Sequence, residues 1–187
     1  AWSGYALPGI ATFPPNSPFY WGPSGTDVVF TYDPDKAKSL LDELGYKDVN
    51  NDGFRETPEG KPLTLRLFAL NEASEDQTIG KLLTAMFEDV GLKIKLSIMD
   101  FGPFAEKVWV NATDAEWSPD YDLIILYETQ VSLDPVGVLR ILGTPEKSAF
   151  GGTQYTGWTD PEFSKLLEEQ GSEMDPQKRL ALVQELI

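Results

Sequence analysis

Apolar residues recur with two different periods along the middle of the chain, and each period predicts a different element. Residues 63–70 and 94–98 carry apolar side chains at every second position, which is the period of a strand with one buried face. Residues 79–90 carry them three and four positions apart, as in a helix that packs on one side, and Gly91 can end that helix. The uninterrupted apolar run at 123–126 is typical of a strand covered on both faces.

Two further features give the start of the first of these helices and the order of the elements. Ser74 and Gln77 have the spacing of a capping box, so the helix is expected to begin at this pair. A short helix is predicted over residues 101–110, ahead of the last strand. The order strand-helix-strand-helix-strand gives parallel strands joined by right-handed crossovers. The predicted fold class is therefore α/β, with an open, mostly parallel sheet flanked by helices on both sides.

Residues 32–46, which read YDPDKAKSLLDELGY, predict a complete helix with both of its ends. Asp33 can cap the first amides, Pro34 suits the first helical position, and Gly45 can adopt the left-handed conformation that closes the last turn. The apolar stripe of this helix consists of Ala37, Leu40, Leu41 and Leu44. We expect the stripe to dock on the sheet.

The last third of the chain is predicted to be helical. Three pairs repeat the combination of an aspartate cap and a proline in the first turn: Asp134-Pro135, Asp160-Pro161 and Asp175-Pro176. An apolar stripe follows each pair, so we expect three helices that cover the sheet.

The chain is expected to form one α/β lobe over residues 1–187. In this lobe, residues 1–31 form a loop-rich first segment, 32–127 hold the first helix and the strand-helix core, and 128–187 form the helical cover. The sequence begins without Met and stops inside an amphipathic pattern that no Gly, Asn or Pro ends. We therefore expect a lobe that is truncated at both ends.

Composition and charge remove several classes of function. The chain has 15 basic and 30 acidic residues, a net charge of −15 and no basic cluster, which argues against nucleic acid as a partner. It contains no Cys and no His, so disulfides, thiolate nucleophiles and Ser-His triads cannot be built. It has no apolar run of about 20 residues and no signal-peptide pattern, so any targeting segment would lie outside it. We expect no enzymatic activity and no required cofactor.

Residues 48–59 match the calcium-loop pattern D-x-[DN]-x-[DN]-G-x5-E. The candidate ligands are Asp48, Asn50, Asp52, the carbonyl of Phe54 and a bidentate Glu59. The loop leads into a strand and not into a second helix, which excludes a paired EF-hand. The alternative is a surface turn in which Asn, Asp and Gly supply the backbone geometry. A bound calcium ion would be structural.

Several segments, in this order, resemble one protein family. They are the helix of residues 32–46, GKPLTLRL, LLTAMFEDVGLKIKLSIMDF, DYDLIIL, WTDPEFSKLLEE and DPQKRLALVQELI. Together they resemble the peptide-, oligopeptide- and nickel-binding class, family 5, of bacterial extracellular solute-binding proteins. The resemblance runs from about Gly4 to the end of the chain and covers the C-terminal lobe of a two-lobed, periplasmic-binding-protein-like fold.

The resemblance implies a role in transport. A protein of this family captures peptides, or a related small ligand, and delivers them to the permease subunits of an ABC importer. The N-terminal lobe of the same chain would complete the cleft. The resemblance also implies a periplasmic or extracellular protein, held at the membrane by the transporter or by a lipid anchor outside this chain.

The loop after the third predicted strand is where the family contacts its ligand, and open α/β sheets place ligands at such ends. In this chain the loop supplies Tyr127, Glu128, Thr129, Gln130 and Val131. Oligopeptide-binding members carry a Trp early in the loop and, three residues on, an Asp that pairs with the peptide amino terminus. Those positions fall on Glu128 and Val131, so the usual carboxylate partner is absent. Either Glu128 substitutes for that Asp or the ligand lacks an α-amine.

An oligosaccharide is the alternative ligand within the same class, because aromatic side chains can stack on sugar rings. The chain offers Trp21, Trp109, Trp117, Tyr155 and Trp158, of which Trp158 is taken as a candidate ligand contact. Core packing is the ordinary role for each of them.

Two functions from other classes stay open. One is a calcium-stabilised structural or adhesion module that uses the loop at Asp48. The other is a glycosidase domain with a carboxylate pair such as Glu128 and Asp134, although nothing in their spacing selects them over the other acidic residues.

Overall fold

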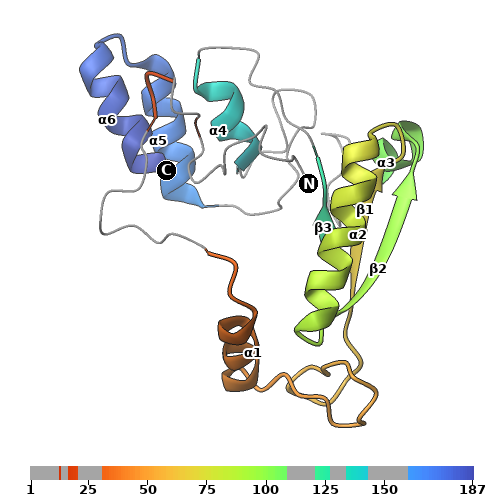
Figure 1. Cartoon of the computed structure of the whole chain (residues 1–187). Coiled ribbons are helices and arrows are strands. Elements are labelled where there is room, and N and C mark those ends of the chain that lie inside the picture. Colours follow the sequence, from red (N-terminus) through yellow and green to blue (C-terminus); the bar gives the residue numbers. More distant parts are fainter. Residues whose placement is uncertain (1–12, 14–16, 21–30, 109–120, 127–133, 143–159) are drawn as a thin grey trace. The chain divides into compact units, whose positions relative to one another are not determined.

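The computed structural model describes residues 13, 17–20, 31–108, 121–126, 134–142 and 160–187 (Figure 1). In chain order the elements are α1 (Pro34–Glu43), β1 (Thr64–Leu70), α2 (Ser74–Asp89), β2 (Lys93–Met99), α3 (Phe101–Val108), β3 (Leu123–Ile124), α4 (Val136–Leu142), α5 (Pro161–Ser172) and α6 (Pro176–Leu186). The chain divides into two compact units. The first holds α1 to β3 and the second holds α4 to α6.

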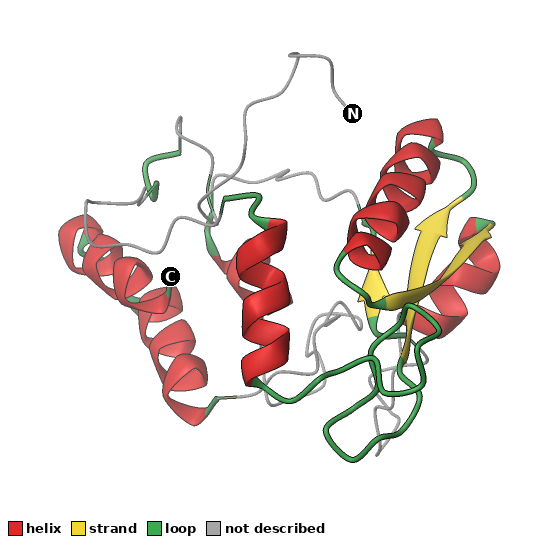
Figure 2. Ribbon diagram, turned by 60° about the horizontal axis from the view of Figure 1, so that its bottom comes forward, coloured by secondary structure: helices red, strands yellow, loops and turns green. Residues whose placement is uncertain are grey.

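The first unit contains a three-stranded parallel sheet with the order β2-β1-β3. In the register of the sheet, Leu67 of the central strand lies between Leu96 and Leu123. All three strands run in the same direction, and helices pack on both faces (Figure 2). The predicted α/β class with an open parallel sheet is confirmed.

The two faces of the sheet are covered by different helices. On one face α2 comes close to the strands at Gly80, where an added Cβ would meet the Leu96 side chain at 3.0 Å and that of Ile125 at 3.5 Å. On the other face Phe68 meets the ring of Tyr121 at 6.1 Å, and Lys107 of α3 lies over the Phe68 ring. Neighbouring residues on β1 thus serve opposite faces, as the two-residue period requires.

The start of β3 is held to β1 by one ion pair. Two nitrogens of the Arg66 guanidinium donate to the Asp122 carboxylate at 3.0 and 3.1 Å, and the Arg66 amide donates to it at 2.7 Å. The Asp122 amide returns a hydrogen bond to the Arg66 carbonyl at 3.1 Å. Because β3 is only two residues long, this pair supplies much of its attachment to the central strand.

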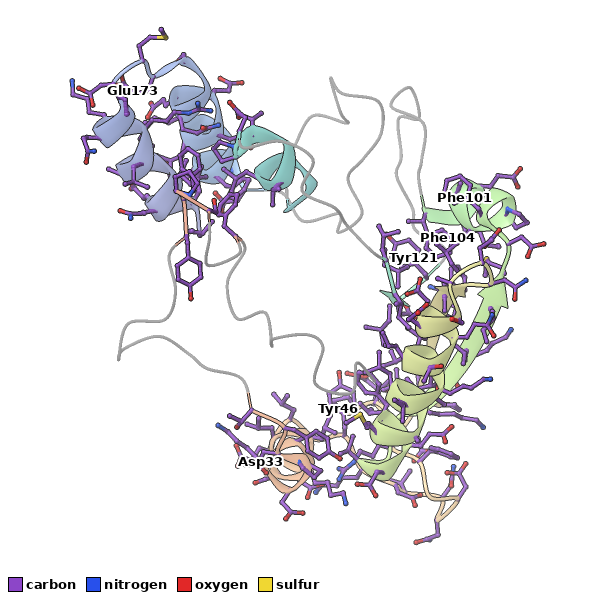
Figure 3. All side chains as sticks on the ribbon, turned by 45° about the horizontal axis from the view of Figure 1, so that its top comes forward. Asp33, Tyr46, Phe101, Phe104, Tyr121 and Glu173 are labelled. Atoms are coloured by element: carbon purple, nitrogen blue, oxygen red, sulfur yellow. The ribbon has the colours of Figure 1, made fainter. Side chains whose placement is uncertain are left out.

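Both predicted ends of α1 are confirmed. The Asp33 carboxylate accepts from the Lys36 amide at 2.9 Å. Gly45, at φ +87°, allows the Tyr46 amide to donate to the Leu41 carbonyl at 2.9 Å, which is a Schellman closure. Figure 3 shows Asp33 at one end of α1 and Tyr46 beyond the other.

The docking of the apolar stripe of α1 was predicted wrongly. No residue of α1 is buried, and Leu40 and Leu44 are largely exposed. The helix is attached instead through Arg55, which pairs with Asp42 and also donates to the Tyr46 carbonyl and, at 2.8 Å, to the Val90 carbonyl. The apolar face is not buried because polar contacts at the C-terminal end of α1 hold the helix.

The predicted capping box at the start of α2 was also wrong. The N-cap is Ala73, so Ser74 is already helical and its hydroxyl donates to the Glu75 carboxylate at 3.0 Å. The side chain of Gln77 reaches back past the cap to the Asn71 carbonyl at 2.7 Å. The segment between β1 and α2 is therefore held by the side-chain amide of Gln77, and not by the hydroxyl of Ser74.

The second unit has its own core. Phe13, Leu139, Phe163, Leu166, Leu167, Val183 and Leu186 form one buried cluster. The predicted Asp-Pro starts of α5 and α6 are confirmed, since Asp160 and Asp175 each accept from two amides of the following turn. The start of α4 differs, because this helix begins at Val136, one residue after Pro135, and Asp134 accepts from the Val136 amide. That residues 128–187 cover the sheet in a single lobe stays a prediction.

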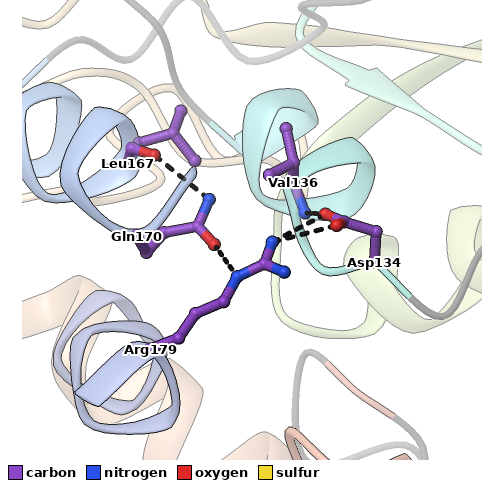
Figure 4. Close-up of polar contacts among 5 residues, drawn as sticks. All are labelled: Asp134, Val136, Leu167, Gln170 and Arg179. Carbon is purple, nitrogen blue, oxygen red and sulfur yellow. Dashed lines mark hydrogen bonds and ion pairs between the residues drawn. The ribbon is translucent and has the colours of Figure 1, made fainter. Parts of the chain in front are cut away.

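A polar bridge that includes the buried Gln170 joins the three helices of the second unit (Figure 4). The Arg179 guanidinium donates to both oxygens of Asp134, at 3.0 and 2.9 Å, and to the Gln170 side chain at 3.2 Å. The Gln170 amide donates in turn to the Leu167 carbonyl at 3.1 Å. The aspartate just before α4 is thus fixed by an arginine from α6.

None of the helices in the described ranges has both the length and the apolar character needed to cross a bilayer.

We expect Asp122→Asn to lower the free energy of unfolding by about 1 kcal/mol at neutral pH, because it weakens a pair that is partly exposed. Hydrogen bonds from Arg66 hold the pKa of Asp122 below its ordinary value of 3.8. A depressed folded-state pKa stabilises at pH above the unfolded value, and this contribution is lost as pH falls through the folded pKa. The difference in free energy of unfolding between wild type and Asp122→Asn should therefore shrink as pH falls from the unfolded pKa through the folded pKa of Asp122. Urea denaturation at several pH values measures this difference.

The matched control is Asp89→Asn, which removes the charge from an exposed pair with Lys38 at 4.0 Å. It should change the free energy of unfolding by no more than about 0.5 kcal/mol. A deficit in Asp122→Asn that stays constant down to strongly acidic pH would contradict the role given to the carboxylate.

Candidate functional site

The carboxyl ends of the three strands meet at one edge of the sheet, because the strands are parallel. Asn71 and Glu72 follow β1, Asp100 follows β2, and residues 125–126 follow β3. Open α/β sheets bind ligands at this edge. It is therefore the candidate functional site of the first unit, and we call it the carboxyl edge.

Polar side chains at the carboxyl edge are tied to one another. The Asn71 amide group donates to Asp100 at 2.9 Å, and the Asn71 backbone amide donates to the Met99 carbonyl at 2.8 Å. The side chain of Gln77 donates to Asn71. The connection after β1 is thereby fixed against the end of β2, which makes this edge a preformed surface.

Two helices begin at the carboxyl edge. α2 starts at Ser74 and α3 at Phe101, so the free amides of both first turns lie there. The Phe101 amide is satisfied by the Glu72 carboxylate at 2.8 Å. Figure 3 shows Phe101 at the beginning of α3, with Phe104 and Tyr121 near it.

One carboxylate at this edge differs from the others. Asp76, in the first turn of α2, is only 5% exposed, and its Oδ2 has no hydrogen-bond partner within the described part of the chain. Burial, and then the neighbouring Glu75 carboxylate, raise the pKa of Asp76 above its ordinary value. A buried carboxyl oxygen without a partner is costly, so this position calls for an explanation.

The sequence-predicted ligand residues belong to the loop and segment that come after this edge in the chain. They are Tyr127, Glu128, Thr129, Gln130, Val131 and Trp158, and all of them lie outside the described residues. β3, which leads into the loop, ends at the carboxyl edge as the prediction required. The ligand assignments of these six residues stay predictions.

Sequence reasoning missed the polar residues that the structure places at the edge. Asn71 and Asp100 each follow a correctly predicted strand by one residue. The rule that was applied to the loop after the third strand would have selected them if it had been applied to all three. Asp76 carried no such signal, because its burial depends on the packing of α2.

The candidate calcium loop is closed by its own side chains. Asp48 accepts from the Asp52 amide at 3.2 Å and from the Gly53 amide at 2.9 Å. Asn50 accepts from the Asp52 amide at 2.8 Å, and Asp52 accepts from the Phe54 amide at 2.9 Å. The polar residues of the calcium pattern thus supply turn geometry.

Glu56, which is not part of the calcium pattern, holds the same loop from inside. It is 5% exposed, and its carboxylate accepts from the Val49 amide at 2.9 Å and from the Asn50 side chain at 2.7 Å. Its own amide donates to the Lys47 carbonyl at 2.9 Å. Glu56 therefore takes the central position in the loop.

The expected calcium ligands are not gathered into one metal site in the described residues. In the ranges that the structure describes, no three acidic side chains come together as a metal site. Glu59, the expected bidentate ligand, lies in a separate turn that the Gly60 amide closes on the Thr57 carbonyl at 2.7 Å. Calcium binding at Asp48, Asn50, Asp52, Phe54 and Glu59 stays a prediction from the sequence pattern alone.

Comparison with known proteins identifies the family. The profile of the bacterial extracellular solute-binding proteins, family 5, middle part, matches residues 1–150. The chain belongs to this family. The resemblance seen in the sequence is therefore confirmed.

Individual relatives agree with this assignment. The chain is 30% identical over 180 residues to the oligopeptide-binding protein AppA of Bacillus subtilis. This match covers 87% of this chain and 33% of AppA. It is 26% identical over 174 residues to OppA of Lactococcus lactis, covering 89% of this chain and 26% of OppA. The chain thus spans about a third or less of these relatives.

Solved structures share the fold. A mannohexaose-bound periplasmic oligopeptide-binding protein of Thermotoga maritima superposes with a TM-score of 0.68 at 29% identity, covering 84% of this chain and 28% of that protein. NikA of Brucella suis, in complex with Fe(III)-EDTA, gives a TM-score of 0.72 at 18% identity, with 95% and 33% covered. The second likeness shows the fold alone.

If Glu56 and not a metal holds the loop, Glu56→Gln should lower the free energy of unfolding by about 1–2 kcal/mol. Glutamine offers one acceptor oxygen in place of two, so one of the two donors, the Val49 amide or the Asn50 side chain, loses its partner. The loss should be the same in EDTA and in millimolar calcium, measured by urea denaturation.

Glu59→Gln makes the same change of charge at an exposed position and should alter the free energy of unfolding by no more than about 0.5 kcal/mol. A rise in Tm with calcium that Asp52→Ala removes would restore the calcium site and contradict this account of the loop.

Proposed function

We propose that the chain is part of the substrate-binding protein of an ABC importer and that it captures peptides for import. The match of the family profile to residues 1–150 is the observation that carries the proposal. The oligopeptide-binding relatives support peptides as the ligand class. The ligand would bind at the carboxyl edge, where a parallel sheet exposes loops and helix starts.

The proposed mechanism is closure of two lobes over the ligand. The carboxyl edge offers polar groups from several segments, but one lobe alone buries only part of a peptide. Residues beyond this chain would supply the opposite wall, since the relatives are about three or more times as long. Closure about a hinge would then present a compact protein to the permease subunits.

An oligosaccharide is a second candidate ligand. The Thermotoga maritima relative was solved with mannohexaose although it is described as an oligopeptide-binding protein, and it shares 29% identity with this chain. The same scaffold therefore accommodates a neutral sugar. Aromatic side chains such as Trp158 would provide the stacking surface.

The protein would act outside the cell membrane and would catalyse no reaction. ATP hydrolysis belongs to other subunits of an importer, and the binding protein contributes affinity and closure. The permease or a lipid anchor would hold the protein at the membrane. Such a protein needs no cofactor.

The full-length protein should bind at least one of a set of di- to pentapeptides or short oligosaccharides. Residues 1–187 alone should bind the same ligand at least about 100-fold more weakly, because half of the contact surface is missing. Isothermal titration calorimetry on both proteins measures the difference. Equal affinity of the two would contradict the two-lobed mechanism, and absence of binding to the full-length protein would contradict the ligand classes proposed.

A further inference from the structure

Asp76 is a buried acidic residue for which the fold of the first unit provides no partner. Its Oδ2 has no hydrogen-bond donor in the described part of the chain, and its side chain is 95% shielded from solvent, being 5% exposed. The other carboxylates at this edge are engaged, since Glu72 accepts from the Phe101 amide and Asp100 from Asn71. Among these carboxylates of the described residues, Asp76 is therefore the exception.

The position of Asp76 directs it to the carboxyl edge. Gly80 lies one helical turn later, on the face of α2 that meets Leu96 and Ile125. Residues four apart share a helix face, so Asp76 lies on the same face of α2 as Gly80. It lies in the first turn of α2, at the end where the parallel strands finish.

A structural role does not account for an aspartate here. Capping would need a bond from its carboxylate to a helix amide, yet the N-cap of α2 is Ala73 and shows no side-chain cap. A packing role would favour an apolar residue, because a buried carboxyl oxygen without a partner costs free energy. The partial positive charge of the helix start stabilises a carboxylate, but only in part.

We propose that Asp76 is a ligand-binding residue that receives a positively charged group of the ligand, an ammonium or a guanidinium, at the carboxyl edge. The inference rests on the proposed function. A cationic group would supply the missing hydrogen-bond donor and the opposite charge in one contact. Asp76 would thereby select charged peptides over neutral sugars.

The free protein would carry a stability penalty for this carboxylate. Burial and Glu75 raise the pKa of Asp76 in the folded state. A raised pKa means that stability falls as pH increases through the window from 3.8 to the folded value. Binding of a cation would offset this loss of stability. The buried carboxylate would thus destabilise the free protein and stabilise the complex.

The test uses the full-length protein, its Asp76→Asn variant and four peptides in two pairs. Trialanine is paired with N-acetyl-trialanine, and Ala-Lys-Ala with Ala-norleucine-Ala, so that each pair differs by one ammonium group. Mannohexaose serves as the neutral probe. Affinities come from isothermal titration calorimetry, and Tm values of the unliganded proteins show that the variant is folded.

We expect the wild type to prefer the ammonium member of at least one pair, and Asp76→Asn to lose this preference with a drop in affinity of about 10- to 100-fold. Without ligand at neutral pH, Asp76→Asn should raise Tm by about 2 °C or more. Glu75→Gln, the matched control, removes the same charge from an exposed neighbour. It should leave the affinities within about twofold.

Every other outcome contradicts either the assignment of Asp76 or the proposed function. If peptides bind but neither pair discriminates, or if Asp76→Asn keeps the discrimination, the assignment of Asp76 is wrong and the transport function stands. If only mannohexaose binds, the cationic ligand is wrong while the family function again stands. If no probe binds to the wild type, the proposed function fails and the assignment of Asp76 fails with it.

Discussion

The central position of β1 in a parallel sheet is the constraint on which the first unit depends. β1 pairs with β2 on one side and β3 on the other, so its residues face helices in both directions. Leu67, Phe68 and Ala69 are consequently all buried. Parallel pairing also forces every crossover to begin at the same edge. The starts of α2 and α3, and the polar residues that precede them, are gathered there by topology.

The carboxylates of the two units fall into two groups that differ in what satisfies them. Asp122 and Asp134 accept from guanidinium groups, and Glu56 accepts from a backbone amide and a side-chain amide. The two aspartates join segments far apart in the sequence, and Glu56 closes a loop formed by residues shortly before it. Asp76 joins nothing within the described part of the chain, although it is as buried as Glu56. Since an unsatisfied buried acid is disfavoured in the free protein, a role in the complex gives it a physical reason.

Local signals made much of the fold predictable from the sequence. The caps at Asp33, Asp160 and Asp175 depend on contacts within one turn, and the periods of the strands and helices depend on which side is buried. The errors arose where tertiary contacts decide. No residue of the α1 stripe is buried, because Arg55 anchors the helix at its end, and no helical period reveals such an arginine.

The candidate site was predictable in part for the same reason. The rule about strand ends selects the carboxyl edge, and the structure adds Asn71 and Asp100 to that edge. That the ligand binds there stays a prediction. The burial of Asp76 could not be foreseen, because an aspartate in the first turn of a helix is ordinarily exposed. It follows from the close approach of α2 to the sheet at Gly80.

The claim that ligand binds at the carboxyl edge is tested most directly by hydrogen exchange of the full-length protein with and without a saturating ligand. The account predicts slower amide exchange on binding at residues 71–77 and 100–104, with no change in the loop at 48–56. Protection confined to that loop, or to α5 and α6, would contradict it.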